Sequence, residues 1–107
     1  MNTDVLNFIK SCIKRRRIRW TYHVNMRLKG RFIDRRIILS SVERYEIIEE
    51  YQKDKYLPSY LIYAKYKGDI IHIHIAADFD NDNVTIVTAY RPTPSKWEMG
   101  LKKRRKL

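Results

Sequence analysis

The sequence predicts an α+β fold in which N-terminal helices pack on one face of a C-terminal, four-stranded antiparallel sheet. Apolar residues recur at three- and four-residue spacing in the N-terminal part of the chain, which is typical of helices with one buried side. From Glu46 onward the β-branched and aromatic content rises, which favours strands. The 107 residues are enough for one hydrophobic core, so we expect a single domain.

The first helix is predicted to start at Thr3, whose hydroxyl can cap it, and to end in the basic run 14–17. Its apolar residues form one buried stripe, which consists of Val5, Leu6, Ile9, Cys12 and Ile13. Residues 17–20 alternate charged and apolar side chains, so we expect a short extended piece there.

Thr21 is the predicted cap of a second helix that runs to about Lys29, after which Gly30 supplies the left-handed residue that terminates it. Asp34 is the predicted cap of a third helix. The apolar residues that this helix turns inward are Ile37, Ile38 and Val42.

Four strands are predicted at 46–52, 59–67, 70–77 and 84–90. A turn at 67–69 and a polar loop at 78–83 connect the last three, which predicts an antiparallel meander.

The strand 70–77 has a two-residue period. It directs Ile71, Ile73 and Ile75 to the face that the helices cover. His72 and His74 point to the opposite face, which we expect to be left for a ligand.

Gly and Pro number three each and fall singly at element boundaries, so no linker divides the chain. We expect one domain over 1–97, followed by a basic, flexible tail over 98–107.

The charge balance points to a polyanionic partner. Lys and Arg number 23 against 12 Asp and Glu, for a net charge of +11, which makes nucleic acid the first candidate. No apolar run approaches the ~18 residues of a transmembrane span, so no membrane partner is expected. Asp4 and Lys10 interrupt the apolar stretch that a secretion signal needs, so we expect no such signal. The single Cys12 suits a reducing compartment, and we expect a cytoplasmic protein.

Ten cations and only one acid, Asp34, lie between residues 14 and 36, and most of the cations are arginines, which favour bidentate recognition of phosphate. His23, Arg27 and Arg31 are spaced by four and so share one side of a helix. An imidazole beside guanidinium groups suits phosphodiester cleavage, although a plain solvated helix face has the same spacing.

His72 and His74 share a strand face, and with Asp78 they could supply metal ligands. A third well-spaced ligand and a second Cys are missing, so we predict no metal site there, and a catalytic or a structural histidine instead. No P-loop, nucleophile elbow or dinucleotide motif is present, and no cofactor is expected.

Four segments together form a recognisable series. They are His23-x-x-x-Arg27-x-x-x-Arg31, the segment 46–51, the strand 71–76, and the ending Thr88-x-Tyr90-x-Pro92 with Trp97. The series resembles a widespread, uncharacterised family of small bacterial proteins similar to the RelE-like and MqsR-like toxin ribonucleases, whose superfamily also groups barnase, EndoU and colicin nucleases. The resemblance covers about residues 12–97. The chain departs from it in placing Gly30 before Arg31 and in having Tyr45 where a glycine commonly follows the third helix.

The resemblance implies a RelE-like fold and a toxin-type endoribonuclease that cleaves single-stranded RNA without a metal, by attack of the 2′-hydroxyl on the adjacent phosphate. It implies proton transfer by His23 or His72, phosphate binding by Arg27 and Arg31, and positioning, stacking or proton transfer by Thr88 and Tyr90. The remaining candidate phosphate contacts are Arg19, Lys29 and Arg91. The resemblance also implies a cognate antitoxin whose acidic surface covers the basic face. It leaves association with the ribosome open.

Two alternatives remain. One is a non-catalytic RNA-binding or ribosome-binding module that uses the same basic, aromatic face. The other is a DNA-binding regulator, because the helices capped by Thr21 and Asp34 are joined by a short turn as in helix-turn-helix units. The DNA-binding alternative ranks last because it leaves the C-terminal strands without a role.

Overall fold

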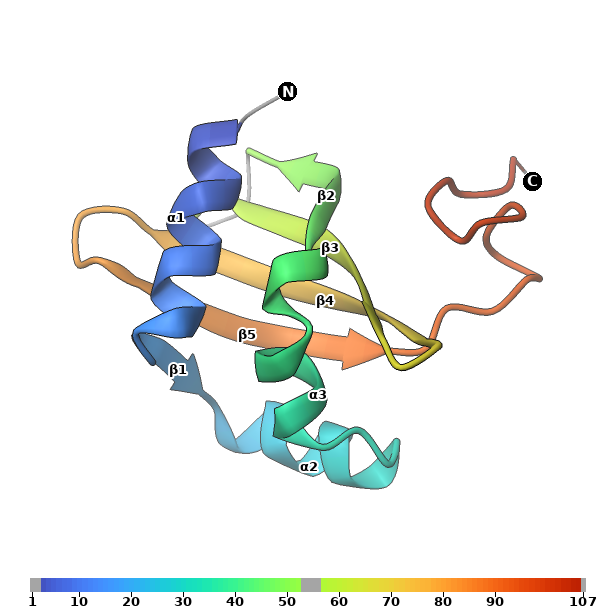
Figure 1. The fold of residues 1–107 in the computed structure, drawn as a ribbon, viewed down its shortest axis with the longest axis horizontal. Helices are drawn as coiled ribbons and strands as arrows, with labels where there is room; N and C mark the ends of the chain where they lie inside the picture. The colour runs from blue at the N-terminus through green and yellow to red at the C-terminus, as the bar shows by residue number, and fades with distance from the viewer. Residues whose placement is uncertain (1–2, 53–56, 107) are drawn as a thin grey trace.

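Three helices and one mixed sheet make up the fold in the computed structural model, which describes residues 3–52 and 57–106 (Figure 1). The elements run in the order α1 (Thr3–Lys14), β1 (Ile18–Trp20), α2 (Tyr22–Gly30), α3 (Arg35–Ser40), a 3₁₀ turn η1 (Val42–Arg44), β2 (Glu46–Tyr51), β3 (Ser59–Tyr66), β4 (Asp69–Asp78) and β5 (Asn83–Tyr90). The predicted α+β class is therefore confirmed.

The sheet has five strands in the order β1-β5-β4-β3-β2, so the prediction of a four-stranded antiparallel sheet was wrong. The strands β2 to β5 are antiparallel as predicted, but the extended piece at 18–20 pairs parallel with β5, in the register Ile18 with Val84 and Trp20 with Ile86. Ile18 and Val84 are 66 positions apart. A parallel pairing at that separation has no turn between its strands, and therefore no local signal in the sequence.

Two of the predicted helix caps are confirmed. The hydroxyl of Thr21 accepts a hydrogen bond from the Val24 amide at 3.1 Å, and the carboxylate of Asp34 accepts one from the Arg36 amide at 2.8 Å. Each bond satisfies an amide that has no partner inside its helix, and so fixes where the helix begins.

The end of α2 differs from the prediction. Gly30 is the last residue of the helix, and the left-handed residue is Phe32, with φ 56°. The amide of Ile33 donates to the Leu28 carbonyl at 2.9 Å, which closes a Schellman motif around Phe32. Because Ile33 and Leu28 are both buried, packing of this apolar pair sets the end of the helix in place of the glycine.

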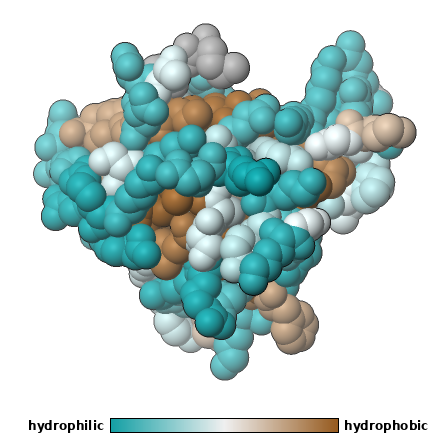
Figure 2. All heavy atoms as spheres, in the orientation of Figure 1, coloured by the Kyte–Doolittle hydropathy of each residue, from teal (hydrophilic) through white to brown (hydrophobic). Residues whose placement is uncertain are grey.

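The core lies between the helices and one face of the sheet (Figure 1). Ile9 and Ile13 of α1 and the isoleucines at 71, 73 and 75 of β4 are fully buried in it, which confirms both predicted apolar stripes. In the same view, hydrophilic residues cover most of the visible surface (Figure 2). In the described part of the chain, no helix is long and apolar enough to cross a bilayer.

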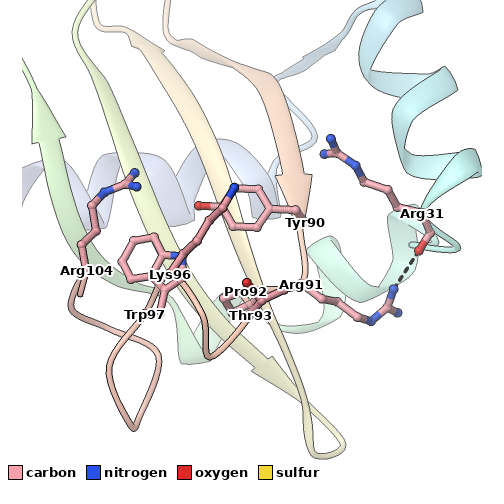
Figure 3. Close-up of a pocket in the computed structure, with 8 residues that line it drawn as sticks. All are labelled: Arg31, Tyr90, Arg91, Pro92, Thr93, Lys96, Trp97 and Arg104. Atoms are coloured by element: carbon pink, nitrogen blue, oxygen red, sulfur yellow. Dashed lines mark hydrogen bonds between the residues drawn. The ribbon is translucent and has the colours of Figure 1, made fainter. Parts of the chain in front are cut away.

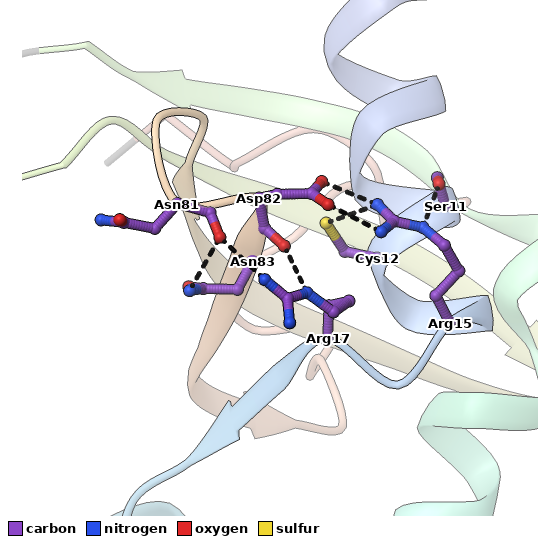
Figure 4. A network of polar contacts seen from close by, with 7 residues as sticks. All are labelled: Ser11, Cys12, Arg15, Arg17, Asn81, Asp82 and Asn83. Carbon is purple, nitrogen blue, oxygen red and sulfur yellow. Dashed lines mark hydrogen bonds and ion pairs between the residues drawn. The ribbon is translucent and has the colours of Figure 1, made fainter.

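A polar network joins the end of α1 to the loop between β4 and β5 (Figure 4). Arg15 donates to both carboxylate oxygens of Asp82 at 2.7 Å, and Arg17 donates to the carbonyls of Asn81 and Asp82. Burial raises the pKa of the nearby Cys12 thiol, which packs as an ordinary core residue. The network holds the start of β1 beside the start of β5.

Tyr45 connects α3 to the core, at the position where the resemblance leads us to expect glycine. Its buried hydroxyl donates to the Ile38 carbonyl at 2.7 Å, and burial raises its pKa. The tyrosine therefore satisfies a carbonyl at the end of the helix, which a glycine could not do.

Replacing Tyr45 by Phe removes this hydrogen bond and leaves its carbonyl partner less well satisfied. We expect the free energy of unfolding to fall by about 1 kcal/mol, as measured by urea denaturation. Tyr66→Phe, in a half-buried tyrosine at the end of β3, is the matched control and should change stability little. Equal losses in both variants would show that the bond to Ile38 is unimportant.

Candidate functional site

The sheet face that the helices do not cover carries polar and aromatic side chains, and we call it the open face. On β4 it presents His72, His74 and Ala76, and the register with β5 brings Tyr90 opposite His72 and Thr88 opposite His74. A bulge at Val87 keeps Thr85, Thr88 and Tyr90 on the same face. This face brings together three of the predicted site residues, His72, Thr88 and Tyr90.

The C-terminal segment 96–105, which we call the C-terminal hairpin, folds back over part of the open face. The Arg105 amide donates to the Lys96 carbonyl at 2.9 Å, and the Glu98 amide donates to the Lys103 carbonyl at 2.7 Å. Trp97, at the base of this hairpin, is only 2% exposed.

Two ion pairs attach the C-terminal hairpin to β2. Lys102 lies 3.0 Å from Glu46, and the Arg104 Nε donates to Glu49 at 2.7 Å. We predicted a flexible tail over 98–107. In the structure Lys102 and Arg104 of that run meet the acids Glu46 and Glu49 of the edge strand β2, which hold this part of the hairpin beside the sheet. Leu107 lies outside the described residues.

His72 lies beneath the C-terminal hairpin and is fully buried. The Trp97 ring packs edge-on against it with centroids 4.4 Å apart. Its Nε2 lies 2.6 Å from the Leu101 carbonyl, and its Nδ1 lies 3.3 Å from the Tyr90 hydroxyl. Burial lowers the pKa of His72, which favours the neutral ring at pH 7.

These contacts define the proton positions on His72. A carbonyl oxygen can only accept, so Nε2 carries the hydrogen and donates to Leu101. In a neutral ring Nδ1 is then the acceptor, and the Tyr90 hydroxyl donates to it. The backbone of the C-terminal hairpin therefore sets the tautomer of His72, and His72 sets the orientation of the Tyr90 hydroxyl.

Tyr90 lies where two hollows of the open face meet. A cavity of about 410 Å³ is lined by Arg31, Tyr90, Arg91, Pro92, Thr93, Lys96, Trp97 and Arg104 (Figure 3). A second cavity of about 290 Å³ is lined by Tyr51, Leu61, His74, Thr88, Tyr90 and Arg104. The two cavities share Tyr90 and Arg104 and so lie next to each other, and we call them together the Tyr90 groove. Burial raises the pKa of Tyr90, so its phenol is protonated at neutral pH.

Cations line the Tyr90 groove on opposite sides. Arg31 follows α2, and one of its terminal nitrogens donates to the Thr88 hydroxyl at 3.0 Å and to the Ala89 carbonyl at 2.7 Å. The anchored Arg31 side chain also lines the first cavity of the groove. The Tyr90 hydroxyl points to the side where Arg104 lies (Figure 3). The guanidinium of Arg104 also stacks 4.7 Å above the Trp97 ring, so its position is fixed as well.

Glu49 balances Arg104 at the back of the Tyr90 groove. Partial burial raises the pKa of this carboxyl, but hydrogen bonds from Arg104 and Tyr51 outweigh that effect and lower it. The same contact with Glu49 raises the pKa of Arg104. The groove thus retains a charged Arg104 that is held in one orientation.

Most of the other predicted site residues lie outside the Tyr90 groove. His23, Arg27 and Lys29 are exposed on α2 and are not among the residues that line the Tyr90 groove. Arg91 lines the groove, but it donates to Asp69 and to the backbone carbonyls of Arg31 and Phe32, so it ties the end of α2 to the start of β4. Arg19 lies on β1, near the opposite end of β5.

The sequence predictions missed Lys96 and Arg104 and gave Trp97 no part in the site. The acidic segment 46–50 could have indicated where the basic tail docks, because acids on a predicted strand offer ion-pair partners to a cationic tail. Its acids are Glu46, Glu49 and Glu50.

The fold and the groove define a small basic α+β protein with a cation-lined sheet face. A match to the family described as "Domain of unknown function (DUF4258)" covers residues 20–91, which is more than half of the chain. The chain therefore belongs to this family. No curated protein and no solved structure matches the chain. The matched range contains the segment from α2 to Arg91, and the C-terminal hairpin lies beyond it.

The sequence offers His72, His74 and Asp78 as candidate metal ligands. Within residues 3–52 and 57–106, no group of three or more His, Cys, Asp and Glu side chains is arranged to hold a metal ion. The Nε2 of His74 lies 2.8 Å from the Ser59 hydroxyl instead.

The tautomer of His72 can be measured directly. We expect the ¹⁵N chemical shifts of the labelled protein at neutral pH to show a protonated Nε2 and an unprotonated Nδ1. A variant that ends at Trp97 lacks the Leu101 carbonyl and should show a mixture of tautomers. The opposite tautomer in the full chain would contradict the hydrogen bonds described above.

Burial of His72 also predicts a pH dependence of stability. Because its pKa is lowered from 6.5 in the folded state, the unfolded state binds the proton more readily as the pH falls through 6.5. Stability is therefore lost from about pH 6.5 down to the lowered value. Between about pH 7.5 and 5.5, we expect the Tm of the wild type to fall a few degrees further than that of His72→Gln. His23→Gln, at an exposed histidine, should follow the wild type.

Proposed function

We propose that this protein is a toxin-type endoribonuclease that cleaves single-stranded RNA at the Tyr90 groove, with no metal or cofactor in the chemical step. One observation carries this function: the Tyr90 hydroxyl donates to a buried, neutral His72 and opens onto a groove lined by Arg31, Lys96 and Arg104. A proton acceptor beside several cations is the combination that phosphodiester cleavage requires.

The reaction starts at the ribose 2′-hydroxyl. Its oxygen attacks the adjacent phosphorus while its proton passes to the Tyr90 oxygen, and the phenolic proton moves to Nδ1 of His72. The bond from phosphorus to the 5′-oxygen breaks, and the Lys96 ammonium protonates the leaving 5′-oxygen. The products are a 2′,3′-cyclic phosphate and a 5′-hydroxyl. Arg31 and Arg104 stabilise the charge that develops on the phosphate oxygens.

His72 is a positioning residue in this scheme as well as the final proton acceptor. Its burial keeps the ring neutral, and its bond to Leu101 keeps Nδ1 free to accept. RNA is the substrate because the scheme needs a 2′-hydroxyl, which DNA lacks.

Biological context forms part of the same hypothesis. A net charge of +11 favours RNA, free or on the ribosome, and an acidic antitoxin protein that covers the open face. The free, buried thiol of Cys12 favours a reducing compartment such as the cytoplasm.

The test is incubation of the purified protein with single-stranded RNA in the presence of a chelator, followed by analysis of the product ends. We expect a 2′,3′-cyclic phosphate, and no cleavage where the nucleotide before the scissile bond is 2′-deoxy. Tyr90→Phe should lower the rate about 10²- to 10⁴-fold, and Arg31→Gln about 10²- to 10³-fold. Tyr66→Phe is the control.

His23→Ala belongs in the same assay because the sequence favours His23 as an alternative proton donor or acceptor. We expect little change, since His23 is exposed on α2 and lines neither cavity of the groove. A loss of cleavage rate as large as that of Tyr90→Phe would show that His23 takes part in proton transfer. Intact RNA with the wild type under all conditions would reject the nuclease.

A non-catalytic RNA-binding module is the second candidate. The burial of His72 beneath the C-terminal hairpin favours it, because a fully buried imidazole with both nitrogens bonded also fits a structural role. This candidate predicts steeply salt-dependent RNA binding without cleavage.

A further inference from the structure

A second cation-lined hollow lies at the opposite end of β5 from Tyr90. It has a volume of about 250 Å³, and we call it the arginine pocket. Its lining residues are Arg16, Arg17, Ile18, Arg19 and Asn83. It lies where the chain leaves α1 and enters β1, next to the first residue of β5.

The arginine pocket and the Tyr90 groove border the same face of the sheet. Ile18 and Trp20 pack against the core, so Arg19 between them projects to the open face. Its register partner is Thr85, which alternates with the buried Val84 and Ile86. Asn83 lies on the same side by the same alternation.

The two hollows are separated by a length that suits several nucleotides. Asn83 and Tyr90 are seven residues apart on β5, which corresponds to about 23 Å at about 3.3 Å per residue. Between them the open face presents Ala76, Thr85 and Thr88, whose small side chains make a shallow floor.

Positive charge is concentrated in the arginine pocket. Within residues 3–52 and 57–106, the exposed guanidinium of Arg19 makes no hydrogen bond or ion pair. Arg17 donates to two backbone carbonyls, which fix it without neutralising it. Of the nearby acids, Asp82 is paired with Arg15, and Asp78 accepts two hydrogen bonds from Asn81.

Arg16 adopts a conformation that favours glycine. Its φ is 62°, and it occupies the left-handed position of a Schellman motif that ends α1, with the Arg17 amide donating to the Cys12 carbonyl at 2.9 Å. A side chain at such a position costs free energy that glycine would avoid. Its guanidinium caps the Ile13 carbonyl at 2.8 Å and so stays close to the pocket.

From this arrangement we propose that the arginine pocket is a second phosphate subsite, and that a single-stranded RNA lies along the open face from this pocket to the Tyr90 groove. The choice of RNA as the polyanion rests on the proposed function, whereas the subsite itself rests on Arg16, Arg19 and their place on the sheet. Arg19 then binds the RNA backbone at a distance from the reacting phosphate and takes no part in the chemistry.

Binding is measured by fluorescence anisotropy with RNA that carries 2′-O-methyl groups, which cannot be cleaved by attack of the 2′-oxygen. The probes are an oligonucleotide of about twelve nucleotides and a dinucleotide, which reaches only one hollow. In Arg19→Gln we expect severalfold weaker binding of the longer probe, and a slope of log affinity against log salt that is smaller by about 0.7. Arg16→Gln with Arg19→Gln should lower the slope by about 1.4. Dinucleotide binding should change less than binding of the longer probe, because the Tyr90 groove stays available to the dinucleotide.

Arg44→Gln is the matched control, because it removes the same charge from an exposed arginine on η1, which packs against β3, α1 and α3 and lines neither the arginine pocket nor the Tyr90 groove. It should leave both affinities and the slope close to those of the wild type. Equal effects of Arg44→Gln and Arg19→Gln would overturn the proposal, because they would show a response to net charge alone. Unchanged binding of the longer probe by the double variant would also overturn it.

Two further outcomes separate this subsite from the proposed function. If the wild type cleaves no RNA but the pocket variants lower the salt slope, the subsite stands and the nuclease fails. If the variants bind RNA as the wild type does but lose affinity for a polyglutamate peptide, the pocket serves an acidic protein, and the RNA subsite is wrong.

Discussion

The open face depends on one buried imidazole and the two groups that bond it. A polar ring removed from water must find partners inside the protein, or its burial is strongly unfavourable. His72 finds them in the Leu101 carbonyl and the Tyr90 hydroxyl, which come from the C-terminal hairpin and the end of β5. The hairpin and the last strand are therefore held together by the same side chain, and Tyr90 is oriented by a residue that solvent does not reach.

Charge distribution follows from how the C-terminal hairpin docks. Exposed ion pairs contribute little individually, but Arg104 combines a pair with Glu49 and stacking on the buried Trp97. The acids of β2 thus neutralise cations of the hairpin, leaving Arg31 and Lys96 at the Tyr90 groove and Arg19 at the far end of β5 without ion pairs among the described residues. Cations therefore lie at both ends of the open face, in the Tyr90 groove and in the arginine pocket.

Features encoded locally could be predicted from the sequence. The caps at Thr21 and Asp34, the two-residue turn at Lys67 and Gly68, and the alternation of β4 each depend on a few neighbouring residues. The pairing of β1 with β5 and the docking of the C-terminal hairpin join segments that are distant in the sequence, so no short pattern marks them. At α2 the local signal was misleading, because packing of Ile33 against Leu28 outweighs the preference for a left-handed glycine.

In the candidate site, too, local patterns could be predicted from the sequence, whereas the placement of distant segments could not. The alternation of β4 placed His72 on the open face, and the resemblance gave Tyr90 a part in the site. Arg31 reaches that face through its bond to Thr88. The four-residue spacing of His23, Arg27 and Arg31 predicted that they share one side of a helix. It could not predict whether that side faces the sheet. Val24 and Leu28 are the residues of α2 that pack into the core. His23 and Arg27 lie beside them on the exposed side of the helix and do not line the groove. Arg31, which follows the helix, does line it. A regular spacing within one helix therefore cannot by itself define a site, whereas two strands in register can, since their pairing fixes which side chains meet.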